Sequence, residues 1–267
     1  MKKKQVFAIV IGISKYANPN VRALKYADKD ARSFADYLHT PVAKGGRGVP
    51  LENVKLLLNE AATEDSIRDA LFEWLKRTVP DDIFFIYFAG HGQPDPIRST
   101  EYYFLPYDAD PHRLGGTAIR QSEIKYAVER YIGAGIIVGF FDACHGAAVS
   151  DQIARRDASA DSGDVKRFLY EVASAKPGVL LFSASEVYEV SFEGYRWGNG
   201  HGVFTYHLIE GLKGRADQDG DNFVLLGELV DYVTEQVQRD TENQQHPMKL
   251  DMGFDRKIPM SLVIPRE

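Results

Sequence analysis

The chain has a single cysteine, Cys144, which directly follows an apolar segment. A second apolar segment, roughly fifty residues upstream, ends at His91. A thiol becomes a strong nucleophile when a neighbouring base or cation lowers its pKa, and histidine can supply that partner. The pair therefore predicts covalent catalysis by a thiolate. The alternative is that Cys144 is buried and inert, packing as a small hydrophobic residue.

Two predicted strands must bring these side chains together. Residues 83–89 and 136–141 are short, continuous apolar runs, as expected for parallel strands covered on both faces. The first ends at Gly90-His91-Gly92 and the second at Asp142-Ala143-Cys144. Ligands of open α/β sheets bind outside the carboxyl ends of the strands. We therefore expect His91 and Cys144 to meet there.

The rest of the chain alternates predicted strands with predicted helices, which indicates an α/β sandwich around a largely parallel sheet. The further strands are expected at residues 6–13, 54–58, 101–105, 179–183 and 258–263, and the helices at 23–38, 63–79, 121–131, 202–212 and 225–237.

Composition narrows the class of protein. The chain has 267 residues and no Pro/Gly/Ser-rich linker, so we expect one domain over 1–267. A net charge of −6 argues against nucleic acid as a partner. No apolar run is long enough to span a membrane. The basic N-terminus precedes a strand rather than a signal sequence, and the lone cysteine cannot form an intrachain disulfide, so a cytoplasmic location is predicted.

The two motifs together resemble the caspase–metacaspase clan of cysteine peptidases. The caspase signature is Q-A-C-[RQG]-G with a histidine about fifty residues upstream. This chain has Asp142-Ala143-Cys144-His145-Gly146 and His91. The Asp, and the His after the Cys, are similar to bacterial metacaspase-like and orthocaspase variants. The resemblance covers most of residues 5–240 and implies a caspase-like three-layer α-β-α sandwich.

The resemblance assigns the catalytic roles. Cys144 attacks the scissile carbonyl, His91 activates the thiol and protonates the leaving amine, and the backbone N–H groups of Gly92 and Cys144 form the oxyanion hole. The chemistry then requires no cofactor. His145 is expected to be a loop residue, because neighbouring side chains that leave a strand diverge. His201, before a predicted helix, is expected in its cap region.

The resemblance also predicts specificity. Asp142 and Asp30 match the acidic positions that line the P1 pocket of metacaspases, which implies cleavage after Arg or Lys. The family's Gly-Cys pair near the second position is replaced here by Tyr26-Ala27. Two alternatives stay open: Asp28 and Asp30 could lie on an exposed helix face, or Arg22 could read a P1 aspartate as in caspases. The positions that follow the fifth strand and could contact substrate are Glu189, Ser191 and Glu193; the alternative is that they belong to a solvated hairpin.

The segment 150–167 is polar and predicted to be a protease-sensitive linker. In the family the corresponding linker is often cut on activation. We expect a zymogen that is cleaved, by itself or by an upstream protease, at basic positions; the alternative is an uncut loop. The candidate positions are Arg155, Arg156, Lys166 and Arg167.

A calcium loop is a further candidate. Asp217, Asp219, Asp221 and Glu228 occupy positions 1, 3, 5 and 12 of an EF-hand-like loop. Asn222 takes the place of the usual glycine and tolerates left-handed geometry. Metacaspases often need calcium, whereas the alternative is that these carboxylates only cap the next helix.

Other functions remain open. A proteolytically silent caspase-like scaffold is the alternative from another class, with the intact Cys144 and His91 against it. The expected partners are protein or peptide substrates. The resemblance implies a role in bacterial stress response, cell death or antiviral defence.

Overall fold

A central sheet organises the protein. The structure, a computed structural model, describes residues 4–95, 101–144, 170–186, 189, 191–251 and 255–264. Among these residues the sheet has eight strands, with the order β11-β7-β6-β3-β1-β2; in addition, β4 pairs with β3 and β5 pairs with β4. The strands are β1 (Val6–Gly12), β2 (Val54–Leu58), β3 (Ile83–Pro94), β4 (Tyr102–Phe104), β5 (Ile119–Arg120), β6 (Ile136–Cys144), β7 (Val179–Ser183) and β11 (Met248–Asp251).

The sheet is mixed but mostly parallel. β2, β1, β3, β6 and β7 pair in parallel, whereas β11 and β4 run antiparallel to their neighbours. The expected strand near the C-terminus exists as β12 (Pro259–Leu262), but it pairs with β10 (Phe223–Leu225) in a separate ribbon. A second ribbon joins β8 (Glu193–Gly194) to β9 (His201–Gly202).

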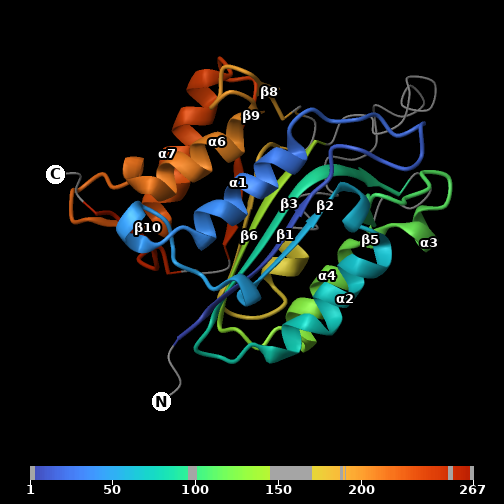
Figure 1. The fold of residues 1–267 in the computed structure, drawn as a ribbon, viewed down its shortest axis with the longest axis horizontal. Helices are drawn as coiled ribbons and strands as arrows, with labels where there is room; N and C mark the ends of the chain where they lie inside the picture. The colour runs from blue at the N-terminus through green and yellow to red at the C-terminus, as the bar shows by residue number, and fades with distance from the viewer. Residues whose placement is uncertain are drawn as a thin grey trace.

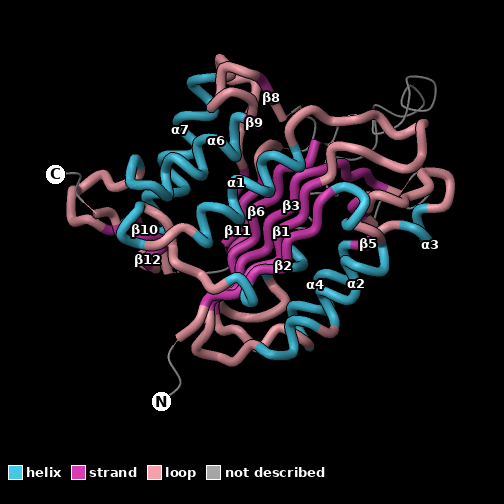
Figure 2. Tube along the Cα trace, in the orientation of Figure 1, coloured by secondary structure: helices cyan, strands magenta, loops and turns pink. Residues whose placement is uncertain are grey.

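Helices cover both faces of the sheet, which gives the three-layer sandwich (Figure 1, Figure 2). On one face lie α1 (Ala27–His39), α6 (Val203–Glu210) and α7 (Leu226–Asp240). On the other lie α2 (Glu64–Phe72) and α4 (Gln121–Arg130), and the short α3 (Leu114–Thr117) sits at one end. Within the described ranges, no helix combines the length and apolar composition that crossing a membrane requires.

The strands carry two cores because successive side chains point to opposite faces. In β3, Phe85 and Tyr87 pack under α1 and α6, whereas Phe84, Ile86 and Phe88 pack under α2 and α4. Burial on both faces explains why the strands read as continuous apolar runs in the sequence.

Two helices differ from expectation. α1 begins at Ala27 rather than residue 23, because the backbone of residues 24–26 bonds to tertiary partners instead. Thr63 caps α2 as expected, but α2 ends at Phe72 and a 3-10 turn follows at Trp74–Arg77, where Trp74 packs edge-to-face on Phe7.

Candidate active site

The two predicted catalytic residues lie at the carboxyl ends of adjacent strands. β3 and β6 pair in parallel, and their register sets His91 opposite Cys144. Neighbouring strands lie about 4.8 Å apart. The backbones therefore meet where a nucleophile and its base would have to meet, and the roles themselves stay predictions.

The imidazole of His91 is buried and held in one tautomer. His91 is 2 % exposed, and its Nε2 lies 2.7 Å from the carbonyl oxygen of Arg22. Since a carbonyl only accepts, Nε2 carries the hydrogen and Nδ1 keeps its lone pair. Nδ1 is buried with no hydrogen-bond partner among the described residues. Burial lowers the pKa of His91, against the bond to Arg22, which raises it. A neutral imidazole with an open Nδ1 is suited to accept a thiol proton.

Tyrosine side chains support the turn around His91. The backbone N–H of His91 donates to the hydroxyl oxygen of Tyr16 at 2.8 Å, and the two rings lie 5.3 Å apart. A Cβ at Gly92 would fall 2.1 Å from the hydroxyl oxygen of Tyr102. Only glycine lets the chain pass there, and the role of the Gly92 N–H in an oxyanion hole stays a prediction.

A cavity of about 520 Å³ opens beside His91. Asp30 and Asp142 line it and are buried, 3 % and 9 % exposed. Arg22 and Lys25 also line it, but both are exposed. The buried part of this lining is therefore acidic, and Asp30 does not lie on an exposed helix face.

Each buried carboxylate has its own supports. Asp30 accepts the backbone N–H of Gly202 at 2.9 Å through Oδ2, and its Oδ1 lies 2.5 Å from Nδ1 of His201. The Thr205 hydroxyl donates to Oδ2 of Asp142 at 2.8 Å. Because Thr205 has one hydrogen to give, the Tyr87 hydroxyl, 2.6 Å away, donates to Thr205.

Burial changes the ionisation of both carboxyl groups. It raises the pKa of Asp142 to about 7, with repulsion from Asp30 as the next cause, while bonds from Thr205 and Ser191 oppose the shift. Burial also raises the pKa of Asp30 well above its ordinary value, against the bond from Gly202. Neither carboxylate forms an ion pair with a lysine or arginine in the described part of the chain. Entry of a cation would favour the ionised forms.

Two of the three other predicted substrate contacts line this cavity. Ser191 is buried there, and Glu193 accepts the N–H groups of Lys25 and Tyr26, each at 3.2 Å. Glu189 is not part of the lining, because its carboxylate bonds to the backbone and side chain of His246, at 2.6 and 2.5 Å.

Sequence reasoning missed three supporting residues of the cavity: Tyr87, Thr205 and His201. His201 directly precedes Gly202, the N-cap of α6, so it lies in the cap region of a helix as expected; the contact of its imidazole with Asp30 was not predicted. The sequence Gly200-His201-Gly202 was the local feature that could have pointed to His201. Nothing in the local sequence marks Thr205, because its hydrogen bond is to Asp142, which lies 63 positions earlier in the chain.

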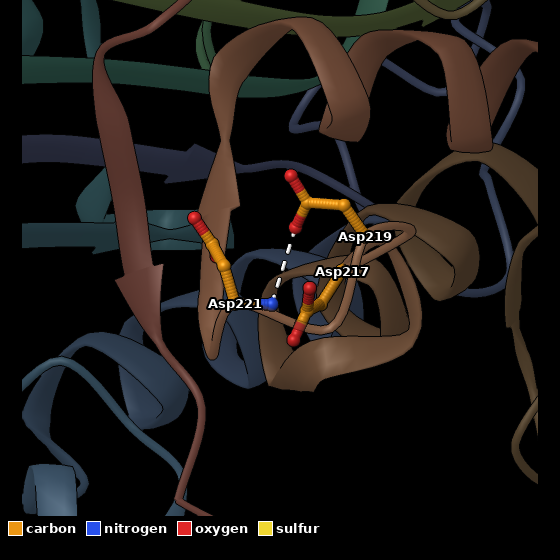
Figure 3. A group of neighbouring side chains, drawn as sticks. All are labelled: Asp217, Asp219 and Asp221. Atoms are coloured by element: carbon orange, nitrogen blue, oxygen red, sulfur yellow. Dashed lines mark hydrogen bonds between the residues drawn. The ribbon is translucent and has the colours of Figure 1, made fainter.

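The candidate calcium loop gathers three carboxylates. Asp217, Asp219 and Asp221 offer oxygens within 4.8 Å of one another (Figure 3). Asn222 has the expected left-handed backbone, with φ of 67°. Glu228 accepts the backbone N–H of Leu225 at 2.8 Å, so it caps α7 and lies outside the group of three. Calcium binding stays a prediction.

Several predictions fall outside the described residues. They are the loop role of His145, the linker 150–167, and its candidate cleavage positions Arg155, Arg156, Lys166 and Arg167.

Comparison with known proteins identifies the family. A family model of the caspase domain matches residues 5–257, nearly the whole chain. The chain therefore belongs to the caspase-domain family, as its motifs predicted. A search of curated protein sequences gave no match. Among solved structures, the fold is similar to a crystal structure of a Geobacter sulfurreducens protein, with a TM-score of 0.63 and 19% identity over 97% of this chain and 100% of that one.

Proposed function

We propose that this protein is a cysteine endopeptidase that cleaves peptide bonds after Arg or Lys. Membership of the caspase-domain family supports the peptidase class. The observation that carries the specificity is the pair of buried carboxylates, Asp30 and Asp142, in the cavity beside His91. Burying a side-chain cation is costly unless opposite charge meets it, and these carboxylates supply that charge.

The proposed reaction uses His91 twice. The Cys144 sulfur attacks the scissile carbonyl carbon, and the thiol proton passes to Nδ1 of His91. The C–N bond then breaks, the leaving amine takes that proton, and a thioester remains. His91 next takes a proton from water, whose oxygen attacks the thioester carbon. The C–S bond then breaks, the acid leaves, and the Cys144 sulfur takes the proton back from His91. Backbone N–H groups of Gly92 and Cys144 stabilise the oxyanion, and such a donor contributes about 10²–10³ in kcat.

Regulation by cleavage belongs to the same proposal. A pocket that accepts basic side chains would accept the basic positions of the linker, at Arg155-Arg156 and Lys166-Arg167. Cleavage there, by the enzyme itself or by an upstream protease, would then promote activity. A role in stress, cell death or defence stays a prediction of the family resemblance.

Matched fluorogenic peptides that differ only at P1 test the specificity. We expect Arg and Lys peptides to be cleaved with kcat/KM at least about 100-fold above that of the Asp peptide. Preference for Asp would contradict the assignment of Asp30 and Asp142 to an acidic P1 pocket and would point to the exposed Arg22. Absence of any cleavage, together with no labelling of Cys144 by a thiol-directed peptide probe, would favour a silent binding module.

A further inference from the structure

His201 separates the acidic cavity from a second cavity. Asp30 lines the first, and His201 lines the second, which measures about 690 Å³ and lies against α1 and α6. The 2.5 Å contact between His201 Nδ1 and Asp30 Oδ1 crosses the wall between them. One imidazole therefore touches a buried carboxylate on one side and a different cavity on the other.

The orientation of the ring leaves its other nitrogen open. Nδ1 faces Asp30, whereas a Cβ at Gly198, in the lining of the second cavity, would fall 2.9 Å from Cδ2 of His201. Nε2 has no hydrogen-bond partner in the described ranges and is not among their buried, unpartnered atoms. The side chain is 12% exposed. Nε2 therefore reaches solvent through the second cavity.

The acidic cavity has a proton to lose when a substrate binds. Asp30 and Asp142 both lie against Gly202, where an added Cβ would fall 3.1 and 2.8 Å from their Oδ2 atoms. Two close, buried carboxyl groups without a cation retain protons. An arginine side chain at P1 needs these carboxyl groups ionised for a favourable ion pair. The same side chain fills the cavity, so it blocks the way to solvent on that side. The displaced proton needs another way out.

We propose that His201 is a positioning residue of the P1 pocket that carries this proton out. In the empty pocket, Asp30 donates its O–H to Nδ1, and Nε2 bears the ring hydrogen. When a cationic side chain enters, the Asp30 O–H bond breaks and an N–H bond forms at Nδ1. The Nε2–H bond then breaks, and water in the second cavity takes the proton. His201 ends neutral in its other tautomer, donating to ionised Asp30. This inference rests on the proposed basic specificity.

The charges around His201 suit a relay rather than a fixed cation. Burial lowers its pKa to about 4, and repulsion from Lys29 and Lys213 contributes. The imidazole is therefore neutral near pH 7 and can accept or donate at Nδ1. Lys29 and Lys213 act on His201 through their charge. The other titratable and charged groups that line the two cavities are Arg22, Lys25, Asp30, His91, Asp142 and Glu193 in the first, and Asp36, Tyr37, Lys44, Tyr206 and Glu210 in the second.

Calorimetry measures the proton directly. The Cys144→Ala protein is titrated at pH 7 with a short peptide amide ending in arginine, in two buffers of different ionisation enthalpy. We expect release of on the order of one proton per peptide, decreasing as the pH rises. The matched citrulline peptide, which is neutral, should release none. Binding of the arginine peptide without proton release would overturn the inference.

Nitrogen-15 spectra of the histidines read the tautomer. In the same protein, His201 should carry its hydrogen on Nε2 when empty and on Nδ1 with the arginine peptide bound. An unchanged tautomer would contradict the relay. This measurement needs no substitution at His201, so it decides the question even if variants of that residue fail to fold.

Substitution of His201 is a third test of its role. With Cys144 intact, His201→Phe should raise KM for the arginine substrate about 10- to 100-fold, because ionised Asp30 loses a donor. Ser33→Ala alters the second cavity without touching Asp30 and should leave KM unchanged. Equal KM values in His201→Phe and wild type would argue against the role. If the arginine peptide is neither bound nor cleaved, the proposed specificity itself fails.

Discussion

Burial decides what the individual site residues can do. His91 is buried at the carboxyl end of β3. Burial lowers its pKa, so the imidazole is neutral near pH 7. The same effect raises the pKa of Asp142 to about 7, because burial penalises whichever form is charged. His91 and Asp142 line the same cavity. A change of pH should therefore alter both the binding of the P1 side chain and the catalytic step.

The pH dependence of specificity tests Asp142. Above its pKa of about 7 the carboxylate is ionised and attracts a P1 cation, and below it the attraction is lost. The ratio of kcat/KM for a P1-arginine peptide to that for its citrulline isostere should therefore rise through pH 7. Titration of Cys144 and His91 affects kcat/KM for both peptides equally, so it cancels in the ratio. Asp142→Asn should lower this ratio about tenfold at pH 8 and reduce its change with pH. An undiminished pH dependence in that variant would contradict the assignment.

At the residue scale, sequence motifs identified Cys144, His91, Asp142 and Asp30, and the fold brings the last three to one cavity. They could be found because each lies in or near a recognisable local segment. His201 and Thr205 could not, because their importance comes from contacts with Asp30 and Asp142 that span 171 and 63 residues of chain.

At the scale of elements, the pocket forms where several strands and helices meet, which we call the junction. β3 provides His91, β6 provides Asp142, α1 provides Asp30, and the β8–β9 ribbon leads into α6 between them. Gly202 is tightly packed in this junction, because a Cβ there would lie 2.8 Å from Oδ2 of Asp142 and 3.1 Å from Oδ2 of Asp30. The specificity of the pocket should therefore be sensitive to one methyl group at Gly202.

Gly202→Ala tests that junction. The backbone at Gly202, with φ of −65°, suits alanine, so the effect should be steric alone. The added methyl would press on Asp142 and Asp30, and KM for an arginine substrate should rise about tenfold or more. Gly116→Ala is the matched control, because nothing lies within 4 Å of its Cβ position. Similar KM values in the two variants would show that the two carboxylates do not read P1.

The positions of most strands were predictable, whereas the end of β3 and the edge strand β11 were not. The buried strands β1, β3, β6 and β7 all appeared as apolar runs, because both of their faces are covered. The edge strand β2 was also predicted, although it is mostly half-buried. β3 continues past Ala89 because Gly92–Pro94 pairs with β4, a contact that no local pattern records. The edge strand β11 was not predicted, since Met-Lys-Leu-Asp is short and mixed in polarity.

On the scale of the whole molecule, two segments outside the acidic cavity are of interest: the acidic loop after α6 and the predicted linker after β6. The acidic loop precedes α7 and the linker follows Cys144 in sequence. Both are candidates for control of activity from outside the site.

Calcium should stabilise the protein if the acidic loop binds it. The carboxylates of Asp217, Asp219 and Asp221 repel one another, and a divalent cation would relieve that repulsion. At calcium about 100-fold above Kd, mass action predicts about 2.7 kcal/mol of stabilisation and a rise in Tm of several degrees. Asp219→Ala should lose the shift, and the exposed Asp81→Ala should keep it. An unchanged Tm in the wild type would exclude the site.

Neutralising the linker tests activation by cleavage. A variant with Arg155, Arg156, Lys166 and Arg167 replaced by glutamine should stay as one chain on incubation and show lower activity than the wild type. Gel mobility and cleavage of the arginine substrate measure the two effects together. Normal activity in an uncut variant would refute control by cleavage while leaving the pocket assignment intact.

The central claim is that Cys144, with His91, cuts after basic residues. The most direct measurement is a cleavage profile of a peptide library by mass spectrometry, with wild type and Cys144→Ala side by side. The account predicts cuts after Arg and Lys by the wild type and none by the variant. Cleavage that survives Cys144→Ala would contradict the mechanism, and wild-type cuts mainly after Asp would contradict the acidic pocket.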